Sequence, residues 1–248
     1  MTTKEIEEQI KSLYDIFFED MKIDKQTGIV ESTKKRFSGY PYVGTNYVDA
    51  PIKILFIPLD TGSDERHNKY HDNKYHNFDT RRERIPGLKN FSPHLAGLYA
   101  TTLYILKNDM GYQEAWETLW GYRDKYKAAK AINSSSDFLP ADLLKMVAFE
   151  NRYRFVTIGR GSNKNERGGS KDRKWIDAKR ESELLMEEIE VFSPDIIVFQ
   201  GTTGLWNCKI NELKKKYQVV VLHHPAYWRN GADRLQYIVG EIESQIKL

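Results

Sequence analysis

The stretch KILFIPLDTG (53–62) gives the clearest indication of the fold. It begins with a short, nearly all-apolar run rich in residues that favour strands, which is typical of a strand buried on both faces of a sheet. The run stops at the turn signal Asp-Thr-Gly. Two similar apolar runs occur later in the chain, IIVFQG (196–201) and QVVVLHHP (218–225). We therefore expect three buried strands, each followed by a turn or by polar residues.

Helical patterns separate these strands. Apolar residues recur at helical spacing over 4–21 and 178–192, which predicts two amphipathic helices. Further stretches with helical patterning are 93–108, 112–132, 140–147, 204–215 and 231–247. Another strand is expected at 146–150 or at 153–158, and the pattern leaves both open. Because strands that alternate with helices form parallel sheets, we predict an α/β fold: a three-layer α/β/α sandwich around a central, mainly parallel sheet of four strands.

Length and composition limit the class of protein. The 248 residues are enough for a sizeable core, and we predict one domain over 1–248, with a helical extension at 1–38 and a long insertion loop at 63–90. No apolar run reaches the ~18 residues that a membrane helix needs. The acidic, polar N-terminus is unlike a secretory signal, so we expect a cytoplasmic protein. The single cysteine, Cys208, excludes an internal disulfide, a Cys-ligated zinc site and a Cys-bound iron–sulfur cluster.

Charge is nearly balanced over the whole chain but not along it. The formal net charge is +3, from 38 Lys and Arg against 35 Asp and Glu. Residues 160–180, however, contain eight Lys and Arg and three acidic residues among Gly, Ser and Asn. This loop is either a solvated, mobile surface segment or a segment that contacts phosphates. The candidates for phosphate contacts are Arg160, Lys164, Lys171, Arg173 and Lys174.

Polar residues that follow the predicted strands are the first candidates for a site. In parallel sheets, ligands bind outside the carboxyl ends of the strands. That rule selects Asp60, Asn151 or Thr157, and His224. An acid after the first strand and a histidine after the last would then face each other across a cleft.

Four segments of this chain resemble the uracil-DNA glycosylase superfamily, and most closely its divergent bacterial or phage-related branches. In chain order they are PYVGTNY (41–47), KILFIPLDTG (53–62), PDIIVFQG (194–201) and LHHPAYW (222–228). The resemblance extends from about residue 40 to the C-terminus, although only these short segments carry it. It implies a glycosylase domain that uses neither a metal nor another cofactor. The single cysteine excludes the branches that hold an iron–sulfur cluster.

The resemblance also implies roles for individual residues. Asp60 would orient the attacking water and stabilise the positive charge that develops on the sugar. His224, which directly precedes Pro225, would donate a hydrogen bond to the departing base, as an oxyanion-hole donor does. An asparagine at the end of a middle strand would read the base. Asn151 fills that role if the strand lies at 146–150, whereas a strand at 153–158 would put Thr157 there.

The loop after Pro225 would hold the DNA helix open once the base has been flipped out. Tyr227 or Trp228 would be the wedge in the minor groove, and Arg229 would contact a phosphate. The alternative is that the two aromatic side chains pack on the final helix.

Two departures from the family pattern concern the substrate. Thr61 and Gly62 stand where the family usually has Pro-Tyr or Pro-Gly, and Ala226 stands where it generally has Ser. Loss of the aromatic residue would loosen selection against substituents at C5 of the base, which makes Thr61 a base-recognition candidate. We therefore expect a modified or bulky pyrimidine, for example in foreign or phage DNA, rather than plain uracil.

The sequence also allows other interpretations of the histidine-rich segment and of the function. His67, His71 and His76 could be metal ligands, part of a nucleic-acid contact or pocket lid, or residues of an exposed loop, and our prediction includes no metal. We expect a monomeric hydrolase that leaves an abasic site in DNA, either double-stranded with a flipped base or single-stranded. The first alternative is a relative of the same fold that binds nucleic acid without cleaving it. The second is a small-molecule hydrolase that shares only the architecture.

Overall fold

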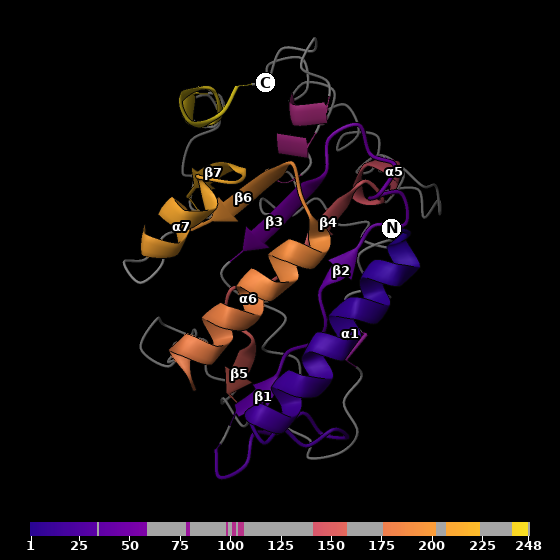
Figure 1. Ribbon diagram of the computed structural model, residues 1–248, viewed down its shortest axis with the longest axis vertical. Coiled ribbons are helices and arrows are strands. Elements are labelled where there is room, and N and C mark those ends of the chain that lie inside the picture. The colour runs from indigo at the N-terminus through magenta and orange to yellow at the C-terminus, as the bar shows by residue number, and fades with distance from the viewer. Residues whose placement is uncertain are drawn as a thin grey trace, which may run out of the picture.

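The computed structural model describes residues 1–33, 35–58, 78–79, 98, 101–102, 104–106, 141–157, 176–201, 207–223 and 240–247. Within these ranges the chain is an α/β protein (Figure 1). Its helices with defined bounds are α1 (Thr3–Asp20), α5 (Ala141–Leu144), α6 (Ala178–Phe192) and α7 (Asn207–Leu213). Its strands are β1 (Lys35–Phe37), β2 (Tyr42–Val43), β3 (Ile54–Pro58), β4 (Val147–Phe149), β5 (Phe155–Thr157), β6 (Ile196–Gln200) and β7 (Gln218–Leu222).

Five of these strands form a mixed sheet in the order β2-β4-β3-β6-β7 (Figure 1). Strands β4, β3, β6 and β7 run parallel to one another, and β2 lies antiparallel to β4 at one edge. The four parallel strands lie where apolar runs predict strands, so the predicted α/β class is confirmed. The sequence does not predict β2, because a strand of two residues is too short to show an alternating pattern.

Both apolar runs between 146 and 158 are strands, so the choice that the sequence leaves open is not exclusive. β4 joins the central sheet beside β3. β5 instead pairs antiparallel with β1 in a separate two-stranded sheet, with Lys35 opposite Thr157. The apolar pattern detects both strands but does not indicate which of them enters the central sheet.

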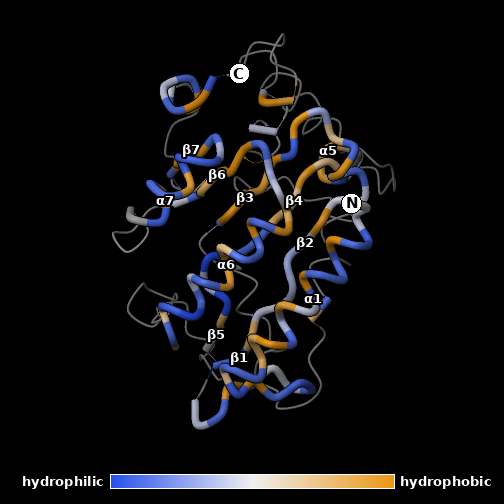
Figure 2. The backbone as a smooth tube through the Cα atoms, viewed as in Figure 1, coloured by the Kyte–Doolittle hydropathy of each residue, from blue (hydrophilic) through white to orange (hydrophobic). Residues whose placement is uncertain are grey.

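The helices α1 and α6 pack side by side and cover one face of the sheet (Figure 1). Each has an apolar stripe that faces the core, visible as alternating orange and blue segments in Figure 2. This core contains Ile6, Ile10, Tyr14, Phe17 and Phe18 of α1, Leu184, Leu185, Ile189 and Phe192 of α6, and Leu55, Ile57, Ile197 and Phe199 of the strands. The first helix, which the sequence indicates as part of an extension, therefore contributes to the same core as the sheet.

Local sequence explains where these two helices begin and end. The Thr2 hydroxyl accepts the Glu5 N–H while Glu5 accepts the Thr2 N–H, which is a capping box. Asp177 caps α6 by accepting two backbone N–H groups, and Ser193 ends it in the left-handed conformation at φ 45°. The helices predicted at 4–21 and 178–192 are thereby confirmed to within one residue.

Other predicted helices are described in part. Residues 98, 101–102, 104–106 and 240–245 are helical, and α5 and α7 lie within the predicted stretches at 140–147 and 204–215. The stretch at 112–132 lies outside the described residues, as does the predicted insertion loop at 63–90 apart from residues 78–79. In the part of the chain that the structure describes, no helix is both long and apolar enough to cross a membrane.

Gly44 allows β2 to approach β4. Its N–H donates to the carbonyl oxygen of Val147 at 3.0 Å. A Cβ atom at this position would lie 2.2 Å from the carbonyl oxygen of Lys145, far closer than atoms can approach without a shift of the backbone. The antiparallel edge of the sheet therefore depends on the absence of a side chain at Gly44.

Substitution of Gly44 tests this close approach. Gly44→Ala should lower the free energy of unfolding by about 1–3 kcal/mol, because the added methyl group forces the backbone of β2 away from β4. Gly240→Ala is the matched control: Gly240 is helical, and its added Cβ would meet nothing within 4 Å. That change should raise the stability by up to about 1 kcal/mol. Urea denaturation measures both effects, and a Gly44→Ala midpoint equal to that of the wild type would contradict the described packing.

Candidate active site at the carboxyl edge of the sheet

The carboxyl ends of three neighbouring strands are level. In the paired register, Pro58 of β3 lies opposite Gln200 of β6, and Gln200 lies opposite Leu222 of β7. Because the strands are parallel, the chain leaves all three at the same edge of the sheet. The strands β3 and β7 are two strand spacings apart, which is about 10 Å. We call this region, where Pro58, Gln200 and Leu222 end their strands, the carboxyl edge.

The two predicted catalytic residues follow this edge in the sequence. Asp60 comes two residues after Pro58, and His224 comes two residues after Leu222. Both lie outside the described residues, and the last described residue before His224 is the exposed His223. The structure thus describes the strand ends that precede Asp60 and His224, with β6 between them.

Asn151 lies at the carboxyl edge, on the other side of β3 from β6. The parallel pairing of β4 with β3 continues beyond β4, since Glu150 N–H donates to Phe56 O at 3.0 Å and Arg152 N–H donates to Pro58 O at 2.9 Å. These two bonds hold Asn151 beside Pro58, where it is buried. Thr157, the alternative base-reading residue, lies in β5 of the two-stranded sheet.

The remaining predicted site residues lie outside the described residues. They are Thr61, Arg160, Lys164, Lys171, Arg173, Lys174, Tyr227, Trp228 and Arg229. The same holds for His67, His71 and His76. Among the residues that the structure describes, no group of three His, Cys, Asp or Glu side chains is arranged to hold a metal ion.

A buried ionic cluster lies behind the carboxyl edge, and no pattern in the sequence predicts it. Its centre is Arg154, which is 1% exposed. The guanidinium donates to Glu150, to Tyr14 and to both carboxylate oxygens of Glu188, with Nη1 at 3.1 Å from Glu188 Oε1. The cluster joins α1, the end of β4 and α6. The only signal in the sequence is the charged segment ENRYR (150–154) between two apolar strands.

Burial governs the protonation of this cluster. It opposes the charge of Arg154, but Glu150, Glu188 and Tyr14 outweigh that effect and raise the pKa of the guanidinium. Burial also raises the pKa of the Glu188 carboxyl above its usual range, although Arg154 opposes this. A buried arginine is stable only when it is paired and hydrogen-bonded, so we infer that Arg154 stays charged and holds the cluster together.

This cluster positions the segment that carries Asn151. Side chains alternate between the two faces of a strand, and Ala148 belongs to the core under α1 and α6. Glu150 points to that same face, where it meets Arg154. Asn151 therefore belongs to the opposite face. Anchoring Glu150 on one side of the sheet fixes the backbone that presents Asn151 on the other.

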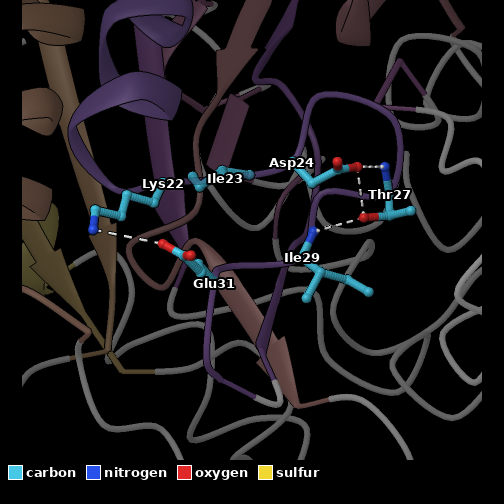
Figure 3. A pocket seen from close by; sticks show the side chains of 6 residues that line it. All are labelled: Lys22, Ile23, Asp24, Thr27, Ile29 and Glu31. Carbon is cyan, nitrogen blue, oxygen red and sulfur yellow. Dashed lines mark hydrogen bonds and ion pairs between the residues drawn. The ribbon is translucent and has the colours of Figure 1, made fainter.

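A surface hollow elsewhere in the molecule is not part of this site. It lies in the turn after α1 and is lined by Lys22, Ile23, Asp24, Thr27, Ile29 and Glu31 (Figure 3). Its polar groups bond to one another: Asp24 accepts the N–H of Thr27 at 2.7 Å, and Lys22 Nζ lies 3.5 Å from Glu31. We interpret the hollow as the surface of a locally satisfied turn.

Substitution of the central arginine tests the cluster. Arg154→Met should lower the free energy of unfolding by about 3–5 kcal/mol, because it leaves two buried carboxylates without their cation. Arg180→Met is the matched control, since Arg180 pairs with the half-exposed carboxylates of Asp20 and Glu187. The control should cost at most about 1 kcal/mol. Urea denaturation compares the two variants, and equal losses would argue against a central role for Arg154.

A further buried carboxyl, that of Glu181 near the start of α6, predicts a pH dependence. Burial raises its pKa to about 7, although the N–H groups of Asp177 and Ile176 donate to it. The folded protein therefore binds this proton more tightly than the unfolded chain, and stability falls as the pH rises through about 7. Glu181→Gln keeps the acceptor oxygen and removes the titration.

The free energy of unfolding of Glu181→Gln should equal that of the wild type near pH 4.5. At pH 8.5 it should be higher by up to about 3 kcal/mol. Urea denaturation at the two pH values measures this difference. A stability difference between the variant and the wild type that does not increase with pH would contradict the raised pKa of Glu181.

Comparisons of this chain with protein-family models, with curated proteins and with solved structures find no match. The chemistry of the residues at the carboxyl edge therefore carries the functional inference. It does so together with the four sequence segments that resemble the uracil-DNA glycosylases.

Proposed function

We propose that this protein is a monofunctional DNA glycosylase that removes a flipped-out, modified pyrimidine and leaves an abasic site. In this proposal the sheet is the centre of a three-layer α/β/α domain of the uracil-DNA glycosylase type. The protein acts as a monomer in the cytoplasm, without a metal or other cofactor. Its substrate is a base in double-stranded or single-stranded DNA.

The single observation that carries the proposal is the level register of β3, β6 and β7. Pro58 and Leu222 both lie level with Gln200, and each is followed two residues later by a proposed catalytic residue. Asp60 and His224 would therefore both lie just beyond the same edge of the sheet, at the ends of two strands that are about 10 Å apart. A nucleoside between them would meet a carboxylate on one side and an imidazole on the other.

The two side chains suit the charges that develop during cleavage. When water attacks C1′ of the sugar, the bond from C1′ to the base nitrogen breaks and its electron pair leaves with the base. Asp60 would orient the water, stabilise the positive sugar and take the proton that the water loses. His224 would donate a hydrogen bond to the base as negative charge develops there. Opposite charges thus meet complementary groups on the two sides of the site.

The remaining roles concern recognition of the base and of DNA. Asn151, held beside Pro58 by the backbone of β3, would read the Watson–Crick edge of the base. Thr61 would leave room for a substituent at C5. Tyr227 or Trp228 would fill the gap in the helix, and Arg229 would contact a phosphate together with the candidate basic residues between 160 and 174.

Incubation of the purified protein with substituted DNA tests the proposal. Duplexes and single strands that carry uracil or a series of C5-substituted pyrimidines are incubated with EDTA, and abasic sites are then cleaved with alkali. The wild type should break the strand at one or more of these bases. Asp60→Ala should abolish the breaks, and His224→Ala should slow them by about 10²–10³-fold.

His223→Ala is the matched control, because His223 is the adjacent, exposed histidine and has no proposed role. It should cleave at nearly the wild-type rate. Tight binding of DNA without abasic product on any base would favour the non-catalytic alternative, and neither binding nor cleavage would contradict both.

A further inference from the structure

Gln200 is an exception in an otherwise apolar strand. It ends β6, the strand IIVFQ (196–200), whose five residues are all buried. Its own exposure is 1%, and its amide oxygen accepts no hydrogen bond from any residue that the structure describes. Buried polar atoms in proteins are nearly always paired, so an orphaned acceptor of this kind calls for a function. An apolar side chain would complete the strand better if packing were the only requirement.

The orphaned oxygen lies on the face of the sheet that carries Asn151. Ile197 and Phe199 belong to the core under α1 and α6, so alternation directs Gln200 to the opposite face. Pro58 pairs with Gln200 on one side and accepts the N–H of Arg152 on the other. Gln200 and Asn151 therefore flank Pro58 at the carboxyl edge, on the same face of the sheet.

Another glutamine of this protein, Gln245, differs from Gln200 because both ends of its amide form hydrogen bonds. Its oxygen accepts the N–H of Val221 at 2.9 Å, and its nitrogen donates to the carbonyl of Val221 at 3.2 Å. That amide is used entirely within the protein, where it ties the C-terminal helical stretch to β7. The amide oxygen of Gln200 has no such partner among the described residues.

We infer that Gln200 is a specificity residue whose amide oxygen accepts a hydrogen bond from a donor on the C5 substituent of the excised base. The inference rests on the proposed function. If Asn151 reads the Watson–Crick edge of a pyrimidine, a group on the other side of Pro58 faces the opposite edge, where C5 lies. An acceptor in that position favours a substituent with an O–H or N–H, such as hydroxymethyl, over a methyl group or hydrogen. The substrate class is thus a pyrimidine with a polar donor at C5.

A binding measurement tests this inference independently of catalysis. The probes are duplexes that carry a 2′-fluoro nucleotide, because the fluorine destabilises the positive sugar and blocks cleavage. One has 5-hydroxymethyluracil and the other has 5-methyluracil, which differs only by the missing hydroxyl. The wild type should bind the hydroxymethyl duplex about 10–100-fold more tightly.

Gln200→Met and Gln200→Leu should reduce that ratio to about one, because leucine offers no acceptor and the methionine sulfur is only a weak one. Gln245→Met is the matched control and should retain the ratio, since that amide bonds only within the protein. Thermal unfolding confirms that each variant is folded. Equal affinity of the wild type for both duplexes, or a ratio unchanged in both folded Gln200 variants, would overturn the inference.

The role of Gln200 and the proposed glycosylase activity can fail independently of each other. Cleavage of ordinary 2′-deoxy substrates without discrimination at C5 would support the glycosylase and refute the role of Gln200. Discrimination in binding that depends on Gln200, without an abasic product from any base, would support its role in a protein that binds the base but does not excise it.

Discussion

The buried guanidinium of Arg154 is the interaction on which the described structure depends. It joins Tyr14 of α1, Glu150 at the end of β4 and Glu188 of α6. Separating these segments would leave charged groups in the interior without partners, which costs far more than the pairing itself contributes. The cluster therefore keeps two helices and the end of the sheet in one arrangement, and it does so directly behind the proposed site.

The two faces of the carboxyl edge differ in how their polar groups are used. On the face covered by α1 and α6, Glu150 and Arg154 bond within the protein. On the opposite face lie Asn151 and Gln200, two amides that flank Pro58. In the proposed function this division would be an advantage, because donors and acceptors that are fixed before the ligand arrives need no reorganisation during the reaction. The ionic side provides the rigidity, and in the proposed function the amide side would recognise the base.

Part of this arrangement could be predicted from the sequence. The helices α1 and α6 are long enough to show a helical period, and their caps, Thr2 and Asp177, are residues that favour helix starts. The parallel strands show as apolar runs, and the turn or polar residues after them predict a site at one edge of the sheet. Strand β2 could not be predicted, because its pairing depends on Gly44 and on a contact with residues about a hundred positions away.

The α/β class, the positions of the apolar strands and the polar residues that follow them are predictable from the sequence alone, because periodicity and turn chemistry are local properties. Three features became apparent only from the three-dimensional packing: β4 rather than β5 enters the central sheet, Arg154 is buried, and the amide oxygen of Gln200 has no partner among the described residues. The reason is the separation along the chain: Arg154 bonds to Tyr14 across 140 positions and to Glu188 across 34. No local pattern reports which distant groups will meet, since packing of the helices on the sheet brings them together.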